Sequence, residues 1–222
     1  GLDILKAKGE LAGQPDRKVV VLTGDGAAQE IGLQSTLAAI HRGLDFYYLC
    51  YDNESYGNTG FQSSPSTPYG ARTSTEPISP AAPHGRLHER RDLFEIWRVQ
   101  KPDYLATISA AYPLDLSEKV YRAGKFTGPK LFVALSPCPP GWDVDPEWSI
   151  DIARLAVETG IWPLREAVRG EVSHTYTPRK FAPVENYLKR QGRFRHLFEP
   201  KRDEPAIAHI QASVNMYWNV AR

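Results

Sequence analysis

Val19-Val20-Val21-Leu22-Thr23-Gly24-Asp25-Gly26 is the stretch that decides the fold of this 222-residue chain. Four apolar residues, three of them β-branched, run directly into Gly-Asp-Gly, which is typical of a strand buried on both faces of a parallel sheet. Glycines let the backbone turn and come close to a ligand, and Asp25 offers a hard oxygen ligand there. Residues 30–41 follow as a predicted helix. A strand, a Gly-rich turn and a helix together form a site for a phosphate group, because backbone N–H groups and the positive helix end meet the anion.

A second apolar run strengthens this interpretation. Residues 46–51 predict another strand, and the polar residues 52–60 follow it. If the two strands are neighbours, oxygens of Asp25 and Asn53 reach one point above the sheet. Mg²⁺ takes about six oxygen ligands, few of them from protein and the rest from phosphate and water. Asp25, Asn53 and the backbone carbonyl of Ser55 are therefore candidate Mg²⁺ ligands beside a diphosphate, although Gly-Asp-Gly alone is often an ordinary turn.

Longer motifs connect this pattern with a known family. Gly24-Asp25-Gly26, followed under thirty residues later by Asn53, resembles the thiamine diphosphate signature. Residues 56–71 resemble, more specifically, the thiamine diphosphate-binding β subunit, or domain, of the 2-oxoacid:ferredoxin oxidoreductases, of the pyruvate:ferredoxin oxidoreductase type. The resemblance extends through Ser-Pro-Cys-Pro at 136–139 to residues 187–194, and it covers nearly the whole chain.

The resemblance implies oxidative decarboxylation of a 2-oxo acid with thiamine diphosphate and Mg²⁺, the electrons passing to iron–sulfur clusters. Pyruvate is the default substrate. A bulky or aromatic 2-oxo acid, or oxalate, stays open because Phe61 stands where the family often has Gly or an aliphatic residue, and because the segment after Ala71 lacks the usual lysine-rich pattern. Two alternatives are a thiamine diphosphate-dependent decarboxylase without electron transfer and a non-catalytic assembly domain.

The resemblance also implies partners. The family activates the cofactor with a glutamate from another subunit or domain, and no residue here stands in a matching motif, so we expect a site shared between chains. Ferredoxin or a similar protein is the expected electron acceptor, and the use of coenzyme A stays open. The cofactor-binding residues that the resemblance and the strand-end pattern give are Gly24, Asp25, Gly26, Ala27, Asn53, Ser55, Asn58 and Thr59.

Two of these residues have alternative roles. Asn58 matches the position that the family uses to contact substrate and cofactor, and it is the candidate catalytic residue; otherwise it is an amide that stabilises the loop. Thr59 either caps the turn or binds the diphosphate.

Cys138 matches the family position that gives the last thiolate to a [4Fe–4S] cluster. The alternative is that Cys138 is an unreactive buried thiol. Such a cluster normally needs four thiolates, so the other three are expected from an N-terminal part that the family usually has. The chain begins at Gly1 and its only methionine is Met216, so we expect a processed chain or a fragment. Cys50, in the middle of a predicted strand, is expected in the core.

Composition and charge argue against nucleic-acid-binding, membrane and disulfide-rich classes of protein. The formal net charge is +1, which gives no electrostatic case for binding nucleic acid or a membrane surface. No stretch approaches the roughly eighteen consecutive apolar residues of a membrane span, and no signal peptide is visible. Two cysteines make no disulfide framework. A reducing cytoplasm is the expected location.

The alternation of strands and helices predicts an α/β fold with a doubly wound, mostly parallel sheet, helices on both faces and ligands at the carboxyl ends of the strands. The resemblance makes this a thiamine diphosphate-binding fold. Further strands are predicted at 104–108, 130–135 and 162–168, and further helices at 1–11, 92–100, 115–126, 146–159, 182–190 and 204–220.

The segment 52–91 reads as a long loop, because it is rich in Pro, Ser, Thr and Gly. Its first half is interpreted as an ordered active-site loop. Its second half, residues 75–91, is interpreted as a solvated surface loop, with a subunit contact as the alternative. We expect residues 1–180 to form the cofactor-binding domain, without the family's N-terminal part, and residues 181–222 a helical tail packed on this domain or on a partner.

Overall fold

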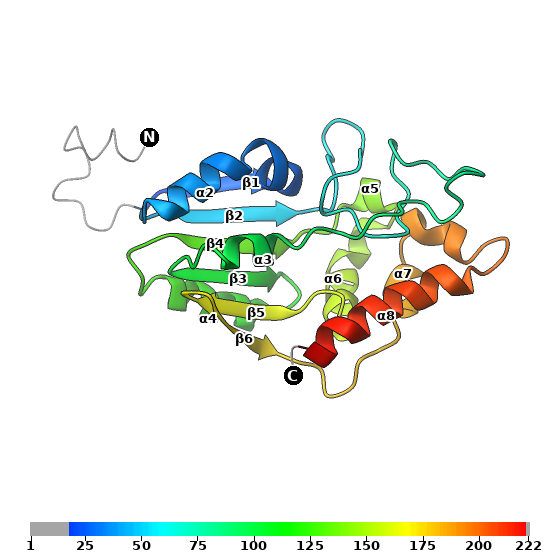
Figure 1. Cartoon of the computed structure of the whole chain (residues 1–222). Coiled ribbons are helices and arrows are strands. Elements are labelled where there is room, and N and C mark those ends of the chain that lie inside the picture. The colour runs from blue at the N-terminus through cyan, green and yellow to red at the C-terminus, as the bar shows by residue number, and fades with distance from the viewer. Residues whose placement is uncertain (1–17, 221–222) are drawn as a thin grey trace.

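One mixed sheet organises the computed structural model, which describes residues 18–220 (Figure 1). Its strands stand in the order β1-β2-β4-β3-β5-β6. β1, β2, β4 and β3 run parallel, β5 is antiparallel to β3, and β6 is antiparallel to β5. The strands are β1 (Val20–Gly24), β2 (Tyr47–Asp52), β3 (Tyr104–Ser109), β4 (Lys130–Leu135), β5 (Leu164–Val168) and β6 (Glu171–Tyr176). The expected mostly parallel sheet is confirmed, whereas the helix expected over residues 1–11 lies outside the described residues.

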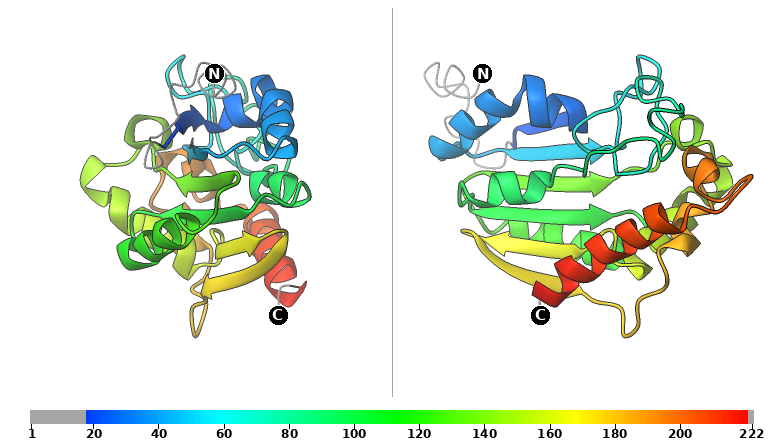
Figure 2. Two further views of the ribbon diagram at one scale, coloured as in Figure 1. Left: turned by 90° about the vertical axis from the view of Figure 1, so that its left-hand side faces the viewer. Right: turned by 45° about the vertical axis from the view of Figure 1, so that its right-hand side comes forward.

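Helices lie on both faces of this sheet, with α2 and α3 on one face and α4 on the other (Figure 2). The helical elements are η1 (Ala27–Ile31), α2 (Leu33–His41), α3 (Leu93–Arg98), α4 (Pro113–Ala123), α5 (Pro139–Trp142), η2 (Pro146–Trp148), α6 (Ser149–Glu158), α7 (Glu185–Leu188), η3 (Gly192–Leu197) and α8 (Glu204–Val220). No helix between residues 18 and 220 is long and apolar enough to cross a membrane.

Successive residues of the central strands face opposite layers, which explains their continuous apolar runs. On β4, Leu131 and Val133 belong to the larger core, whereas Phe132 packs in a smaller cluster with Ala123 of α4. Cys50 is fully buried in the larger core, as expected. The segment after residue 180 adds buried side chains to the same core, among them Tyr187.

Several predicted elements differ from the structure. The strand expected at 162–168 is present as β5, but it is antiparallel and pairs with β6, which we did not predict. Arg169 and Gly170 between them both have positive φ, at 50° and 93°, which is the geometry of a tight hairpin turn. The polar sequence of β6 carries little apolar pattern. The helix expected at 182–190 shrinks to α7, and the basic stretch after it forms η3.

Two predicted helices change type along their length. The one expected at 30–41 is divided, because the π-helical turn η1 ends before Gly32 and α2 begins after it. The one expected at 146–159 begins with the short 3-10 turn η2 and continues as α6.

The segment between β2 and α3 lacks regular structure, as expected, apart from two isolated bridges, at Tyr56–Gln62 and Ser79–Ala82. It is nevertheless well packed. Ser66, Thr67 and Ala71 are fully buried, and the backbone N–H of Arg72 donates to the carbonyl of Arg193, 3.0 Å away. The part around residues 64–71 is therefore internal to the domain and is held by the C-terminal segment, whereas most of residues 74–91 are exposed or partly exposed.

The last helix is anchored at Gly160, just after α6. The indole Nε1 of the buried Trp218 donates to the Gly160 carbonyl at 3.0 Å. Gly160 has a φ of +80°, and a Cβ built on it would lie 2.5 Å from the same indole nitrogen. Both its backbone conformation and its contact with α8 therefore require glycine.

We expect Gly160→Ala to lower the free energy of unfolding by about 1–3 kcal/mol more than Gly43→Ala, because overpacking adds to the cost of a positive φ. Gly43 is the matched control, since its φ is +61° and a Cβ there would have no atom within 4 Å. Urea denaturation of both variants measures the difference, and equal losses would show that α8 does not press on Gly160.

Candidate cofactor site at the strand ends

Asp25 follows β1 directly, at the carboxyl edge of the sheet, and its side chain is completely buried. One carboxylate oxygen, Oδ2, accepts a hydrogen bond from the Ser64 hydroxyl. The other, Oδ1, has no hydrogen-bond partner among the described residues. Burial, and next the negative charge of Asp52, raise the pKa of Asp25 to about 8. A buried oxygen without a partner is costly, so this atom fits a ligand position for a cation.

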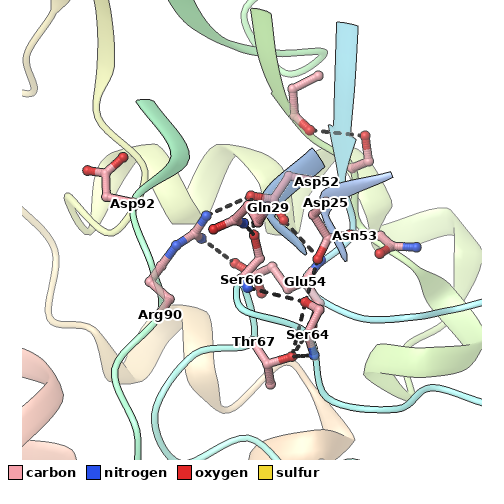
Figure 3. Close-up of polar contacts among 12 residues, drawn as sticks. Asp25, Gln29, Asp52, Asn53, Glu54, Ser64, Ser66, Thr67, Arg90 and Asp92 are labelled. Atoms are coloured by element: carbon pink, nitrogen blue, oxygen red, sulfur yellow. Dashed lines mark hydrogen bonds and ion pairs between the residues drawn. The ribbon is translucent and has the colours of Figure 1, made fainter. Parts of the chain in front are cut away.

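The second strand ends in a cluster of buried charge, which Figure 3 shows beside Asp25. Asp52 and Glu54 are both buried. Arg90 donates to both of them, with Nη2 at 2.7 Å from Asp52 and Nη1 at 2.8 Å from Glu54, and Arg193 donates to Glu54 at 2.6 Å. Three buried carboxylates thus face two guanidinium groups within the part of the chain that the structure describes. Neither guanidinium pairs with Asp25, so a divalent cation would stabilise the ionised form of this carboxyl, which burial disfavours.

The residues 75–91 are therefore not a purely solvated loop. Arg90 closes the buried cluster, which corrects the prediction for this part of the segment. Arg86 pairs with Glu76 at 3.0 Å within the loop itself, whereas the side chain of Arg72 remains largely exposed. Sequence alone gave no signal that separated Arg90 from its basic neighbours.

Serine side chains connect Asp25 with Asp52 through the matched motif. The hydroxyl of Ser66 donates to Asp52 at 3.1 Å, and its backbone N–H donates to the hydroxyl of Ser64 at 3.2 Å. Gln29, in η1, donates to Ser66 at 2.5 Å. We did not predict these three residues, although Ser-Ser-Pro-Ser-Thr lies within the family motif. They link the ends of β1 and β2 into one network.

Asn53 and Ser55 alternate with the two buried carboxylates along the turn. Asn53 lies on the side of the turn away from Arg90 (Figure 3), and its Oδ1 accepts from the Ser55 N–H at 3.2 Å. The Ser55 hydroxyl is buried without a partner among the described residues. Residues 18–220 contain no cluster of three His, Cys, Asp or Glu suited to a metal, so a cation bound here depends on amide or carbonyl oxygens as well as on Asp25.

Gly26, after β1, allows another part of the chain to pack closely on the backbone and does not form an unusual turn. Gly26 has a φ of −64° and already lies in a helical conformation, which corrects the expected sharp turn. A Cβ on Gly26 would lie 2.3 Å from the ring of Tyr56, whose hydroxyl donates to Glu30. Ala27 follows, and its carbonyl accepts from Gly32 at 2.6 Å in the π-helical turn. The ring of Tyr56 therefore packs directly on the buried backbone of Gly26.

The other predicted site residues lie around this cluster. Asn58 and Thr59 are exposed at the tip of the turn that the Tyr56–Gln62 bridge closes, and the Thr59 hydroxyl donates to Gln62 at 2.5 Å. The structure therefore does not bring Asn58 into the buried network.

Cys138 is half-buried at the start of α5, beyond the end of β4. A Cβ on Gly141 would lie 2.2 Å from the Phe61 ring. Phe61 thus packs on the segment that carries Cys138.

The chain is similar to proteins of known families. Residues 5–132 match the family model described as thiamine pyrophosphate enzyme, C-terminal TPP binding domain. A pyruvate synthase subunit PorB of Methanosarcina barkeri is 40% identical over 216 residues, covering 97% of this chain and 71% of the relative. The ketoisovalerate oxidoreductase subunit VorB of Pyrococcus furiosus is 40% identical over 201 residues, covering 87% of this chain and 63% of the relative.

A solved structure shares the fold. It is a 2-oxoglutarate:ferredoxin oxidoreductase from Magnetococcus marinus with 2-oxoglutarate, coenzyme A and succinyl-CoA bound. It has a TM-score of 0.50 and 22% sequence identity, and the match covers 67% of this chain and 56% of that chain. The expected α/β fold is thereby confirmed.

We expect Asp25→Asn to abolish stabilisation by Mg²⁺ with thiamine diphosphate while leaving the metal-free chain at least as stable. The amide keeps the shape of the side chain but removes the charge that attracts the cation. A ligand at about one hundred times its Kd stabilises by about 2.7 kcal/mol, and this gain should vanish. Thermal unfolding with and without the two ligands measures it.

Asp151→Asn on α6 is the matched control for this substitution, because Asp151 is half-exposed and, among residues 18–220, pairs only with Arg154 on the surface. Stabilisation retained in Asp25→Asn at the level of the control would exclude Asp25 as a ligand.

Proposed function

Because the chain belongs to the family of thiamine diphosphate-binding β subunits of the 2-oxoacid:ferredoxin oxidoreductases, we propose that it binds the Mg²⁺-diphosphate end of thiamine diphosphate where β1 and β2 end. The observation that carries the proposal is the buried Asp25 oxygen that has no partner among residues 18–220, next to the turn with Asn53. Asp25, Asn53 and the Ser55 carbonyl hold the Mg²⁺. Gly24, the last residue of β1, and the helical residues Asp25 to Ala27 face the diphosphate.

The chain's own residues bind and orient the reactants. When bound, thiamine diphosphate supplies the electron sink that lets the bond between the carboxylate and the oxo carbon break. Asn58, exposed on its turn, offers an amide to the substrate and the cofactor, and Thr59 supports the diphosphate. The buried network holds the metal ligands in place while the exposed turn meets the partner subunit that supplies the catalytic glutamate.

Pyruvate is the first candidate substrate, because the relatives named pyruvate synthase subunit PorB align with nearly the whole chain. A branched 2-oxo acid is the second candidate, because the ketoisovalerate relative has the same identity of 40%. Cys138 would hold one iron of a [4Fe–4S] cluster, which would carry electrons to ferredoxin or a similar acceptor. We place the complex in the cytoplasm.

The isolated chain should bind thiamine diphosphate weakly, because the metal ligands contact only the diphosphate end of the cofactor. It should turn over no 2-oxo acid, because no acidic residue here is placed to exchange a proton with the pyrimidine. The assembled complex should decarboxylate pyruvate with reduction of a viologen dye. A panel of pyruvate, 2-oxoisovalerate, an aromatic 2-oxo acid and oxalate, given to both preparations, tests this. Rapid turnover by the chain alone would contradict a site shared between subunits.

Cys138→Ser in the complete complex should lose one [4Fe–4S] cluster, since a hydroxyl replaces a thiolate poorly on iron. Cys50→Ala is the control, because burial raises the pKa of the Cys50 thiol far above its ordinary value and keeps it protonated. Iron and sulfide analysis measures the loss. Equal iron in both variants would exclude Cys138 as a ligand.

A further inference from the structure

We propose that Arg90 and Arg193 are positioning residues that hold the turn at residues 52–55 in the conformation that binds the metal. The inference rests on the proposed function, and it assigns the task of shaping the metal site to two side chains that come from outside the strand ends. Arg90 belongs to the long loop after β2, and Arg193 belongs to η3 near the C-terminus. Neither arginine is itself offered as a ligand.

The turn needs such support because its middle residue has an unfavourable backbone conformation. Glu54 lies between the two ligand residues Asn53 and Ser55 and has a φ of +63°. A residue other than glycine pays a cost of order 1 kcal/mol for the left-handed region. The planar Glu54–Ser55 peptide continues from this conformation, so the position of the Ser55 backbone, from which its carbonyl projects, depends on Glu54. A group that fixes Glu54 therefore fixes a metal ligand.

Contacts from three directions hold Glu54. Its carboxylate lies between Arg90 at 2.8 Å and Arg193 at 2.6 Å. Its carbonyl accepts from the Thr67 hydroxyl at 2.6 Å, and its N–H donates to Asp52 at 3.1 Å. The residue is buried, so these charge-assisted bonds are little screened by solvent. Loss of either arginine would release one side of the turn.

Arg90 fixes the distance between the two carboxylates that bracket Asn53. One planar guanidinium spans Asp52 and Glu54 with two different nitrogens. A lysine ammonium carries the same charge but lacks this rigid fork, so it cannot set both carboxylates at once. The Arg90 side chain is 22% exposed and lines a cavity of about 300 Å³ beneath α8, which leaves room for a lysine without a steric clash.

Arg193 reaches the turn by two routes. It pairs directly with Glu54, and its guanidinium stacks on the ring of Trp142 at 3.9 Å. Trp142 in turn donates its indole N–H to the carbonyl of Asn53 at 3.0 Å. Gln191 accepts from Arg193 Nε at 2.8 Å and fixes the plane of the guanidinium. Arg193 thus contacts Glu54 directly and Asn53 through Trp142, so it supports the residues on both sides of the Asn53–Glu54 peptide.

The test is Arg90→Lys in the assembled complex, stripped of cofactor and titrated with Mg²⁺ at saturating thiamine diphosphate by calorimetry. We expect the apparent Kd for Mg²⁺ to rise about tenfold, a change of about 1.4 kcal/mol. Arg86→Lys is the control, because Arg86 is paired in the same loop but contacts Glu76 and Ser63 rather than the turn. The unfolding midpoint of the cofactor-free complex should change equally in both variants.

Different results reject different statements. If the wild-type complex binds thiamine diphosphate without any dependence on Mg²⁺, the proposed metal site is wrong and this inference falls with it. If the wild type depends on Mg²⁺ but Arg90→Lys and Arg86→Lys give the same Kd, only the positioning role is overturned. A loss of Mg²⁺ affinity matched by a large drop in the midpoint of Arg90→Lys alone would mean general destabilisation, and it would also overturn that role.

Discussion

The ion pairs of Asp52 and Glu54 with Arg90 and Arg193 are the interaction on which the rest of the site depends. They bury Asp52, Glu54 and Arg193, and partly bury Arg90, at the carboxyl edge of the sheet. Breaking such a pair by removing one partner costs about 3–5 kcal/mol, because the remaining charge stays buried and unpaired. The long loop and the C-terminal segment must therefore both pack onto the end of β2, which explains how a loop without regular structure is ordered.

The same network explains why the site calls for a cation. Asp25 stands beside Asp52, and like charges in a buried place raise the free energy of the ionised form. The two arginines are already occupied by Asp52 and Glu54, so among residues 18–220 no cation pairs with Asp25. A divalent cation shared with a diphosphate supplies the missing charge. The fold thus positions Asp25 as the first metal ligand and fixes the turn at residues 52–55 beside it.

The sequence predicted what depends on local pattern. Continuous apolar runs identified β1 to β4 and placed Asp25 and Asn53 at the strand ends. The expectation that β1 is buried on both faces was wrong, because β1 is an edge strand on which Val20 and Leu22 are exposed. The network of ion pairs was not predicted, because Glu54 and Arg193 are 139 residues apart. In the sequence, an arginine that will be buried cannot be distinguished from any other basic residue. β6 was not predicted either, because a polar edge strand lacks an apolar run. At Gly26 the expected neighbour was a ligand, whereas the structure places the Tyr56 ring there, and that contact could not be predicted from spacing.

The most direct measurement is electron–nuclear double resonance of Mn²⁺ bound in place of Mg²⁺ to the assembled complex with thiamine diphosphate. If Asp25 and the turn hold the metal beside the diphosphate, the spectrum will show ³¹P couplings, and Asp25→Asn will remove the bound Mn²⁺ signal. A ³¹P-coupled Mn²⁺ signal that survives unchanged in Asp25→Asn would contradict a metal site at the end of β1.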